Sequence, residues 1–365
     1  MRKKNFALTL LLALFVMPAI AQEGKITEPP PPWAYGFTIP PGPQPAPAPP
    51  SAAAAPPAAA ANPYPDDGTL RHLPESKLAF TITQIRDNFN PADWYPEDHP
   101  AMPDVVAHGK RPEVRACAYC HYPNGRGNSE NASLAGLPYE YFVQTMLDFK
   151  NGLRKSADWR KANTNAMAAF AKGMTDDEIN ASAEYYSSLK WTPYFKVVET
   201  TTVPKTRIVT GMFLALDGDA QEPLGQRIIE VPVNTERTEV LRDGKSGFIS
   251  YVPLGSIRRG EELVKTGGGK TVQCAACHGA NEMGQGITPP LAGRSASSMV
   301  RQMYDMQNGY RRGVWSNVMM KPVVKNLTNE DMLDIAAYLT SLSVQPASAE
   351  AAPACLHSQK PPTST

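Results

Sequence analysis

The sequence predicts a mainly α-helical protein made of two copies of one helical module, with a small β insertion between them and a proline-rich, disordered N-terminal arm. Three observations lead to this prediction. The second half of the chain repeats the first at a nearly constant offset. Each copy carries the start and stop signals of helices. The residues between the copies are rich in Val, Ile and Thr, which favour strands.

The repeat extends over most of each module. Adding 157 to the residue number carries the Leu-Ala-Gly triplet at 134–136 onto 291–293 and Asp148 onto Asp305, without a gap for about thirty-five residues. After a slip of four residues the offset is 153, and it carries Met167 onto Met320. Duplication of one ancestral module is the simplest explanation.

The sequence of each copy predicts two long helices. Apolar spacing favours helices over 139–151 and 297–308, each followed by a glycine that suits a helix C-terminus. Thr175 with Glu178 forms a capping box, and Thr328 followed by Asp331 is a close variant, so terminal helices should begin there and run to Leu189 and Leu342. A methionine-bearing loop is expected between the two helices of each copy.

Two complete Cys-x-x-Cys-His motifs carry the chemistry. This is the attachment signature of c-type haem: two thiols three residues apart can each bond one vinyl group of a porphyrin, and the adjoining imidazole can bind the iron. With six histidines in the chain, a histidine follows a given Cys-x-x-Cys by chance about one time in sixty. A zinc site or a redox dithiol would leave both histidines unexplained. We therefore predict two covalently attached haem c groups, held by Cys117, Cys120, His121, Cys274, Cys277 and His278.

Each iron needs a ligand on its other face, and a thioether supplies one without adding charge. Met167 and Met320 occupy equivalent places in the repeat, so we predict them as the axial ligands. The ordinary alternative is that they fill the core, as methionines often do. Met319 competes for the second iron and Met174 for the first, although Met174 aligns with an apolar leucine and is expected in the core.

Histidines upstream of the first motif offer another possibility for the first iron. His72, His99 or His108 could replace methionine, and such a site would have a lower reduction potential. No equivalent histidine precedes the second motif, which argues against this alternative.

The N-terminus has the layout of a secretory signal. Basic Arg2, Lys3 and Lys4 precede an apolar run over 6–17 that is too short to span a bilayer, and Ala21 suits cleavage. An uncleaved anchor is the alternative. Export agrees with haem attachment outside the cytoplasm, so we predict a periplasmic protein. With 36 basic and 35 acidic residues, the net charge of +1 argues against nucleic acid as a partner.

We divide the chain accordingly. The expected order is a signal peptide at 1–21, a Pro/Ala-rich linker at 22–67, an N-terminal extension packing on the first haem domain at 68–103, the two haem domains at 104–191 and 256–343 with the β-rich insertion at 192–255 between them, and a disordered tail at 344–365. Cys355 in the tail is expected to be an unpaired thiol, with an intermolecular disulfide as the alternative.

Taken together, these residues resemble the class I cytochromes c, and the duplication resembles the two-domain dihaem group called cytochrome c-four. The resemblance covers about half of the chain. It implies small helical bundles with His/Met-ligated haem and a role in electron transfer in the periplasm. In that family a proline carbonyl commonly accepts a hydrogen bond from the proximal histidine; Pro289 stands at that place in the second repeat, but Ala132 takes it in the first.

The insertion departs from the family pattern. Strands are expected within 197–208, 226–233 and 248–252, with Asp243-Gly244 as a turn. We interpret this segment as a clamp over the linker or as a recognition surface for a redox partner.

Electron transfer is the first functional hypothesis, with redox proteins as partners: a donor dehydrogenase or quinol-oxidising complex, and an acceptor oxidase or reductase. Membrane association would occur only through such a partner. One alternative is an electron-accepting subunit of a dehydrogenase. The other, which has no positive support in the sequence, is a dihaem enzyme such as a peroxidase. In such an enzyme the first iron, without Met167 as a ligand, would be the active site, and His99 or His108 would act as its acid or base.

Overall fold

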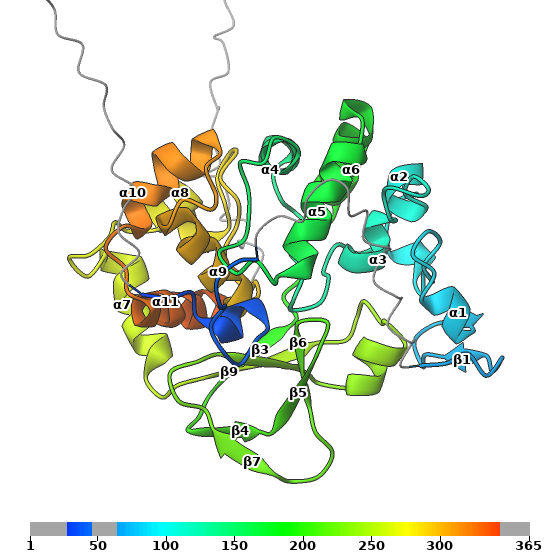
Figure 1. Ribbon diagram of the computed structural model, residues 1–365, viewed down its shortest axis with the longest axis horizontal. Coiled ribbons are helices and arrows are strands. Elements are labelled where there is room, and N and C mark those ends of the chain that lie inside the picture. Colours follow the sequence, from blue (N-terminus) through cyan, green and yellow to red (C-terminus); the bar gives the residue numbers. More distant parts are fainter. Residues whose placement is uncertain (1–27, 46–63, 344–365) are drawn as a thin grey trace, which may run out of the picture.

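The computed structural model describes residues 28–45 and 64–343. Two helical modules lie side by side, and strands from the segment between them lie below both in the view of Figure 1. The predicted fold class, mainly α with small sheets, is confirmed. Within the described residues no helix is both long enough and apolar enough to cross a membrane.

Module 1 is built around the first Cys-x-x-Cys-His motif. Its helices are α2 Asp104–Ala107, α3 Cys117–His121, α4 Tyr139–Lys150, α5 Ala162–Gly173 and α6 Asp176–Ser188. α6 begins with the predicted capping box, in which the Glu178 backbone N–H donates to Thr175 Oγ1 at 3.2 Å and the Thr175 backbone N–H donates to Glu178 Oε2 at 2.7 Å. Apolar side chains of α4, α5 and α6 form one core with Trp191.

Module 2 repeats this plan with a longer first helix. Its elements are α7 Ser256–Thr266, α8 Ala275–His278, η4 Ala280–Glu282, α9 Ala296–Gln307, the π-helical turn η5 Trp315–Met320, α10 Lys321–Val324 and α11 Asn329–Ser341. α7 and α11 approach closely at Gly260, where an added Cβ would lie 1.9 Å from the backbone oxygen of Asp334. Glycine is therefore required at this crossing.

The expected methionine loops are helical, which corrects the prediction. Met167 lies inside α5, and Met320 is the last residue of η5. The residues around Met167 are mostly alanine, the strongest helix former, so the local sequence favours a helix where the haem motif suggested a loop.

The insertion forms small sheets, as predicted. A three-stranded sheet has the order β3 Phe195–Glu199, β9 Phe248–Val252 and β8 Ile229–Pro232, with β3 parallel and β8 antiparallel to β9. Two antiparallel pairs join β4 Thr202–Pro204 to β7 Gln221–Pro223 and β5 Thr206–Val209 to β6 Met212–Ala215. Ile229, Val231 and Val252 belong to the same apolar core as α9 and α11, so the insertion is packed onto module 2.

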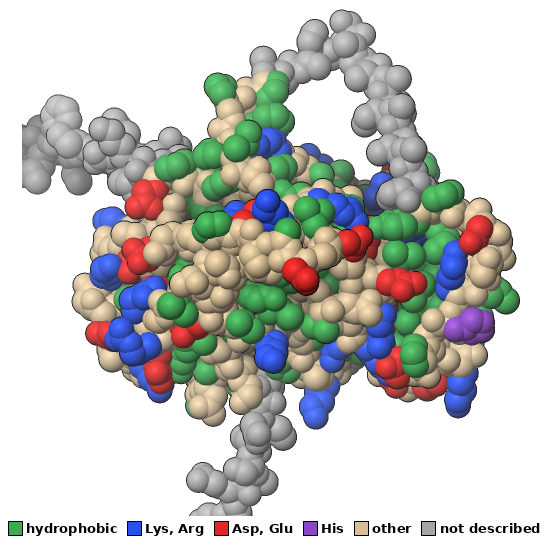
Figure 2. Space-filling model, turned by 90° about the horizontal axis from the view of Figure 1, so that it is seen from below, with side chains coloured by type: hydrophobic (Ala, Val, Ile, Leu, Met, Phe, Trp, Pro, Cys, Tyr) green, Lys and Arg blue, Asp and Glu red, His purple; other side chains and the backbone are tan. Residues whose placement is uncertain are grey.

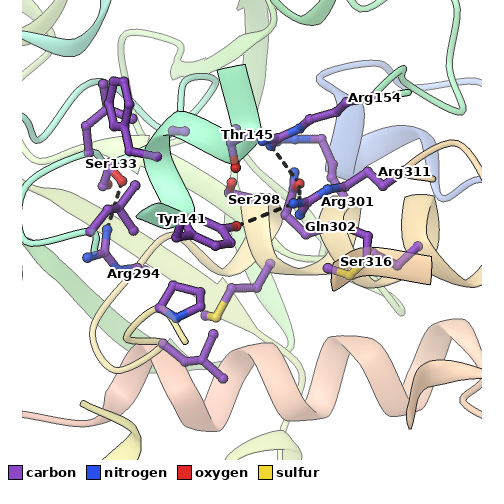
Figure 3. A pocket seen from close by; sticks show the side chains of 18 of the residues that line it. Ser133, Tyr141, Thr145, Arg154, Arg294, Ser298, Arg301, Gln302, Arg311 and Ser316 are labelled. Atoms are coloured by element: carbon purple, nitrogen blue, oxygen red, sulfur yellow. Dashed lines mark hydrogen bonds between the residues drawn. The ribbon is translucent and has the colours of Figure 1, made fainter. Parts of the chain in front are cut away.

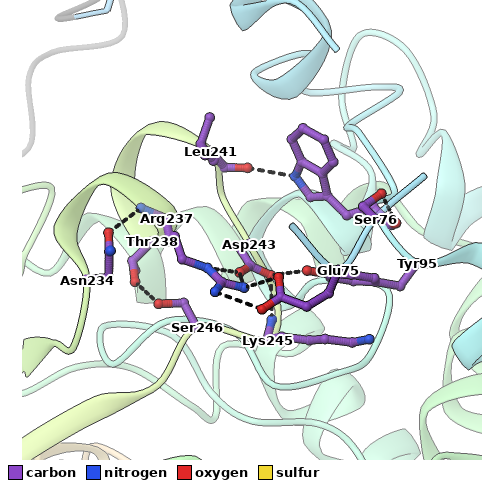
Figure 4. Close-up of polar contacts among 12 residues, drawn as sticks. Glu75, Ser76, Tyr95, Asn234, Arg237, Thr238, Leu241, Asp243, Lys245 and Ser246 are labelled. Atoms are coloured by element: carbon purple, nitrogen blue, oxygen red, sulfur yellow. Dashed lines mark hydrogen bonds and ion pairs between the residues drawn. The ribbon is translucent and has the colours of Figure 1, made fainter. Parts of the chain in front are cut away.

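The N-terminal extension contacts the insertion as well as module 1. It contains β1 Arg71–His72, β2 Ala79–Phe80, α1 Ile82–Ile85 and η2 Pro96–Asp98. Trp94 Nε1–H donates to the Leu241 carbonyl at 2.8 Å. Arg237, which lies in the π-helical turn η3 Glu236–Val240, forms ion pairs with both Glu75 and Asp243 (Figure 4). The link to module 1 includes the Ala116 backbone N–H, which donates to the Asn88 carbonyl at 2.9 Å.

Part of the predicted linker is packed, which corrects its assignment as a coreless spacer over 22–67. Residues 28–45 cross module 2, and the turn η1 Pro32–Tyr35 buries Trp33 and Tyr35. Tyr35 O–H donates to Asp305 Oδ1 at 2.7 Å. The prolines here start a 3-10 turn, for which their fixed φ is suited, and the two aromatic side chains supply the buried area. The predicted signal peptide, the Pro/Ala tract over 46–63 and the tail with Cys355 lie outside the described residues.

Candidate functional site

A single continuous cavity of about 350 Å³ lies between the two modules. Both modules contribute its walls, and Figure 3 shows polar side chains from α4 and α9 meeting across it. Every residue predicted to hold a haem lines this cavity: Cys117, Cys120, His121, Met167, Cys274, Cys277, His278 and Met320.

The two histidines are oriented in the same way. His121 Nδ1 lies 2.8 Å from the Ala132 carbonyl oxygen, and His278 Nδ1 lies 2.8 Å from that of Pro289. A carbonyl oxygen can only accept, so each Nδ1 carries the proton and each Nε2 keeps its lone pair. The alanine in the first repeat thus makes the same hydrogen bond as the proline in the second.

Burial keeps both imidazoles neutral. It lowers the pKa of His121 to about 4 and also lowers the pKa of His278. His278 Nε2 is buried and has no hydrogen-bond partner among the described residues. A buried, neutral nitrogen without a partner, on a cavity wall, suits an iron ligand.

The first cysteine of each motif stands at the start of a short helix, and the second lies next to the histidine at its end. In each motif one helical turn brings both cysteines to the same cavity wall as the histidine that follows them. Burial raises the pKa of Cys117 to about 11, which keeps its thiol protonated in the protein without haem. The arrangement of each motif fits a porphyrin joined through two thioether bonds.

The two predicted methionines are half-buried and pack against the cores of their own modules. Met319 is 49% exposed, while Met174 is only 4% exposed and lies in the core of module 1, as expected from its alignment. Met174 and Met319 also line the cavity, so the choice of Met167 and Met320 rests on their equivalence in the repeat.

The alternative histidine ligands lie elsewhere. Among the described residues that line the cavity, none is His72, His99 or His108. His99 Nε2 lies 3.0 Å from Asp93 Oδ2, and its Nδ1 lies 2.9 Å from the Pro100 carbonyl oxygen. Both of its ring nitrogens are engaged there, so bis-histidine ligation of the first iron has no support in this arrangement.

Sequence reasoning missed a group of basic side chains that also line the cavity: Arg154, Lys161, Arg294, Arg301 and Arg311. Burial lowers the pKa of Arg154 to about 9 and that of Lys161 to about 7. Lys161 Nζ, Arg294 Nε and Arg311 Nε are buried without a hydrogen-bond partner in the described part of the chain. Buried cations with unused donors suit anionic groups, and each haem carries two propionates that could fill this role.

A signal for two of these residues was present in the repeat. The offset of 157 carries Arg154 onto Arg311, as it carries Asp148 onto Asp305. The backbone reflects the same symmetry: Lys155 N–H donates to the Tyr310 carbonyl at 2.8 Å, and Arg312 N–H donates to the Leu153 carbonyl at 2.7 Å. The modules therefore meet about a pseudo-two-fold axis at this point.

Aromatic rings also bridge the modules. Tyr141 of α4 stacks on Trp315 of η5, with ring centroids 6.5 Å apart and planes 11° apart. Burial would raise the pKa of Tyr141, but the charges of Arg311 and Arg154 outweigh burial and lower it to about 8.

Comparison with known proteins agrees with this geometry. The family model for cytochrome c matches residues 106–190 and 257–343. Cytochrome c-554(548) of Halomonas halodenitrificans is 37% identical over 90 residues, which cover 24% of this chain and 96% of that protein.

Two other relatives match over longer stretches of the chain. Cytochrome c4 of Azotobacter vinelandii is 22% identical over 250 residues, covering 67% of this chain and 91% of the relative. The thiosulfate dehydrogenase electron acceptor of Thiomonas intermedia is 25% identical over 238 residues, which cover 64% of this chain and 82% of that relative. Three other curated relatives are matched over only 28%, 60% and 64% of their own lengths.

The two motifs, their shared cavity and the two matched domains define a protein with two covalently attached haem c groups. The chain belongs to the cytochrome c family. When bound, each haem supplies an iron that takes up and releases one electron. The relatives that match over most of their length are named as cytochromes and as an electron acceptor, in line with the prediction that the protein is not itself an enzyme.

Proposed function

We propose that the protein is a periplasmic electron carrier in which His121 and Met167 ligate the first iron and His278 and Met320 ligate the second. The four cysteines of the two motifs would form the thioether bonds. The main support is that both sets of side chains line one cavity, with each histidine held by a backbone carbonyl and its other ring nitrogen left for a ligand bond.

The chain's own residues then have three roles. The histidines and methionines fill both axial positions of each iron, which discourages binding of a small substrate. The buried arginines and Lys161 balance the propionates. Apolar side chains of the two module cores exclude water from the cavity walls. We further propose that residues 104–191 and 256–343 are the two electron-carrying units, with 192–255 as a clamp between them.

The periplasmic location is supported by the signal-like N-terminus. A redox titration followed by visible absorption tests the carrier function. Two reversible one-electron steps are expected, and carbon monoxide should leave the spectrum of the reduced protein unchanged, because no axial position is open. Binding of carbon monoxide to either reduced haem at neutral pH would contradict the proposal.

A second candidate is an electron-accepting subunit of a periplasmic dehydrogenase. The similarity to a thiosulfate dehydrogenase electron acceptor, which covers 64% of this chain and 82% of that relative, favours it. Purification from the native source distinguishes the two. A persistent stoichiometric partner supports the subunit function, and a free monomer supports the soluble carrier.

A further inference from the structure

Exposed apolar side chains are distributed unequally between the two modules. Of the thirteen large apolar side chains that are exposed in the described part of the chain, six lie in module 2 and none lies between 104 and 191. We call these six residues the module 2 patch: Val272, Met283, Ile287, Val314, Val318 and Met319.

The module 2 patch surrounds the opening of the haem cavity. Val272, Ile287 and Met319 are exposed and also line the cavity wall, so the cavity reaches the surface between them. Val318 precedes Met319 in η5, and Val314 lies one turn earlier, which extends the apolar surface outward. A haem edge in this module would be the part of the cofactor closest to solvent.

The repeat shows that module 1 lacks this surface. At the equivalent positions module 1 has Arg115, Arg126 and Glu130 in place of Val272, Met283 and Ile287, and Asn165 in place of Val318. Two modules with the same haem motif thus differ in polarity at the cavity opening.

Other segments also cover the haem motif of module 1. Arg242 of the insertion lies over the Tyr119 ring, 4.3 Å from its centroid, and donates to the Tyr119 carbonyl. Asn124 Nδ2–H donates to the Gly244 carbonyl at 2.7 Å. Among the described residues, the hydrogen bonds made by 272–287 stay within module 2. Consistent with this difference, Cys277 is exposed whereas its counterpart Cys120 is only partly exposed.

The charge around the patch is positive. The segments 270–288 and 308–327 together contain five basic residues and one acidic residue, Glu282, whose side chain is buried. In the part of the chain that the structure describes, no ion pair involves Arg312, Lys321 or Lys325. Elsewhere, as on the face in Figure 2, basic and acidic side chains are interspersed.

We propose that the module 2 patch is the docking surface for an acidic redox protein, so that electrons enter and leave the chain through the second haem site, while the first exchanges electrons mainly with the second. This inference rests on the proposed carrier function. An apolar contact with the unpaired Arg312, Lys321 and Lys325 close to it in sequence is suited to a transient complex that forms quickly and releases quickly.

Stopped-flow reduction of the full-length holoprotein by flavodoxin hydroquinone, a small acidic redox protein, tests the proposal. Val318→Asp replaces an apolar side chain that is 66% exposed with a charged one, and Asn165→Asp introduces the same charge at the equivalent exposed position of module 1. We expect the second-order rate constant at low salt to fall about tenfold for Val318→Asp and to stay within about twofold for Asn165→Asp. Lys325→Glu should also lower the rate and weaken its salt dependence.

Equal effects of Val318→Asp and Asn165→Asp, or no effect of Val318→Asp, would overturn the proposal. Sedimentation velocity adds a second check: a wild-type dimer that Val318→Asp dissociates would show that a second copy of the chain covers the patch, and would also overturn it. Dithionite must reduce both haems of every variant. A haem that dithionite cannot reduce reversibly would count against the carrier function itself. This control therefore distinguishes failure of the docking proposal from failure of the proposed carrier function.

Discussion

Arg294 joins the two modules through buried hydrogen bonds, and its removal should weaken the whole assembly. Its guanidinium donates to the Ser133 carbonyl at 2.8 Å and to the Ala135 carbonyl at 2.9 Å, and it lies 4.4 Å from the centroid of the Trp191 ring. Arg294 belongs to module 2, and all three partners belong to or directly follow module 1. Burial lowers the pKa of Arg294 to about 10, so the guanidinium remains charged at neutral pH.

The size of the expected loss of stability follows from the two carbonyl oxygens that accept hydrogen bonds from Arg294. Arg294→Met keeps most of the side-chain volume but leaves two carbonyl oxygens without their donor, at a cost of about 1–3 kcal/mol each. Part of this cost is offset because the charged group no longer has to be desolvated. We expect the free energy of unfolding to fall by about 2–4 kcal/mol.

Urea titration of the holoprotein, followed by far-ultraviolet circular dichroism, measures this change. Arg312→Met is the matched control, because Arg312 is exposed and its side chain makes no hydrogen bond within the described residues; its effect should stay below about 0.5 kcal/mol. A loss below about 1 kcal/mol for Arg294→Met would refute the idea that this arginine holds the modules together.

Two further predictions concern the N-terminal segment and Asp305, the buried carboxyl group of α9 that Tyr35 of this segment contacts. Trp33→Ala should lower the free energy of unfolding by about 3–5 kcal/mol in the same titration, whereas Ile39→Ala, on the same segment but 66% exposed, should cost little; similar small losses would mean that the segment is only loosely attached. Burial raises the pKa of Asp305 to about 6. Because the folded protein holds this proton more tightly than the unfolded chain, stability should fall as the pH rises from about 4 to about 6, and Asp305→Asn should remove this part of the pH dependence. An unchanged pH profile in Asp305→Asn would contradict the assignment.

The features that depend on local sequence could be predicted. The Cys-x-x-Cys-His motifs, the capping boxes at Thr175 and Thr328, and the glycines after the long helices each specify structure within a few residues, and the duplication supplied the rest of the helical plan. Position in the repeat also identified Met167 and Met320 as residues that line the cavity.

The features that depend on distant packing could not be predicted. The proline-rich composition around Trp33 and Tyr35 suggested a spacer, because nothing local shows that α9 offers a surface to bury them. The parallel pairing of 195–199 with 248–252 joins strands about fifty residues apart, and no turn specifies it. The basic cavity lining could not be predicted at Arg294, because this residue aligns with an apolar leucine in the first repeat, although the repeat does carry Arg154 onto Arg311.

Axial ligation by one methionine in each module is the central structural claim about the function, and one measurement tests it most directly. The near-infrared absorption band between a thioether sulfur and ferric iron should lose about half of its intensity in Met167→Leu, about half in Met320→Leu, and all of it in the double variant, while Met319→Leu should leave it intact. Full retention of the band in either Met167→Leu or Met320→Leu would contradict the account.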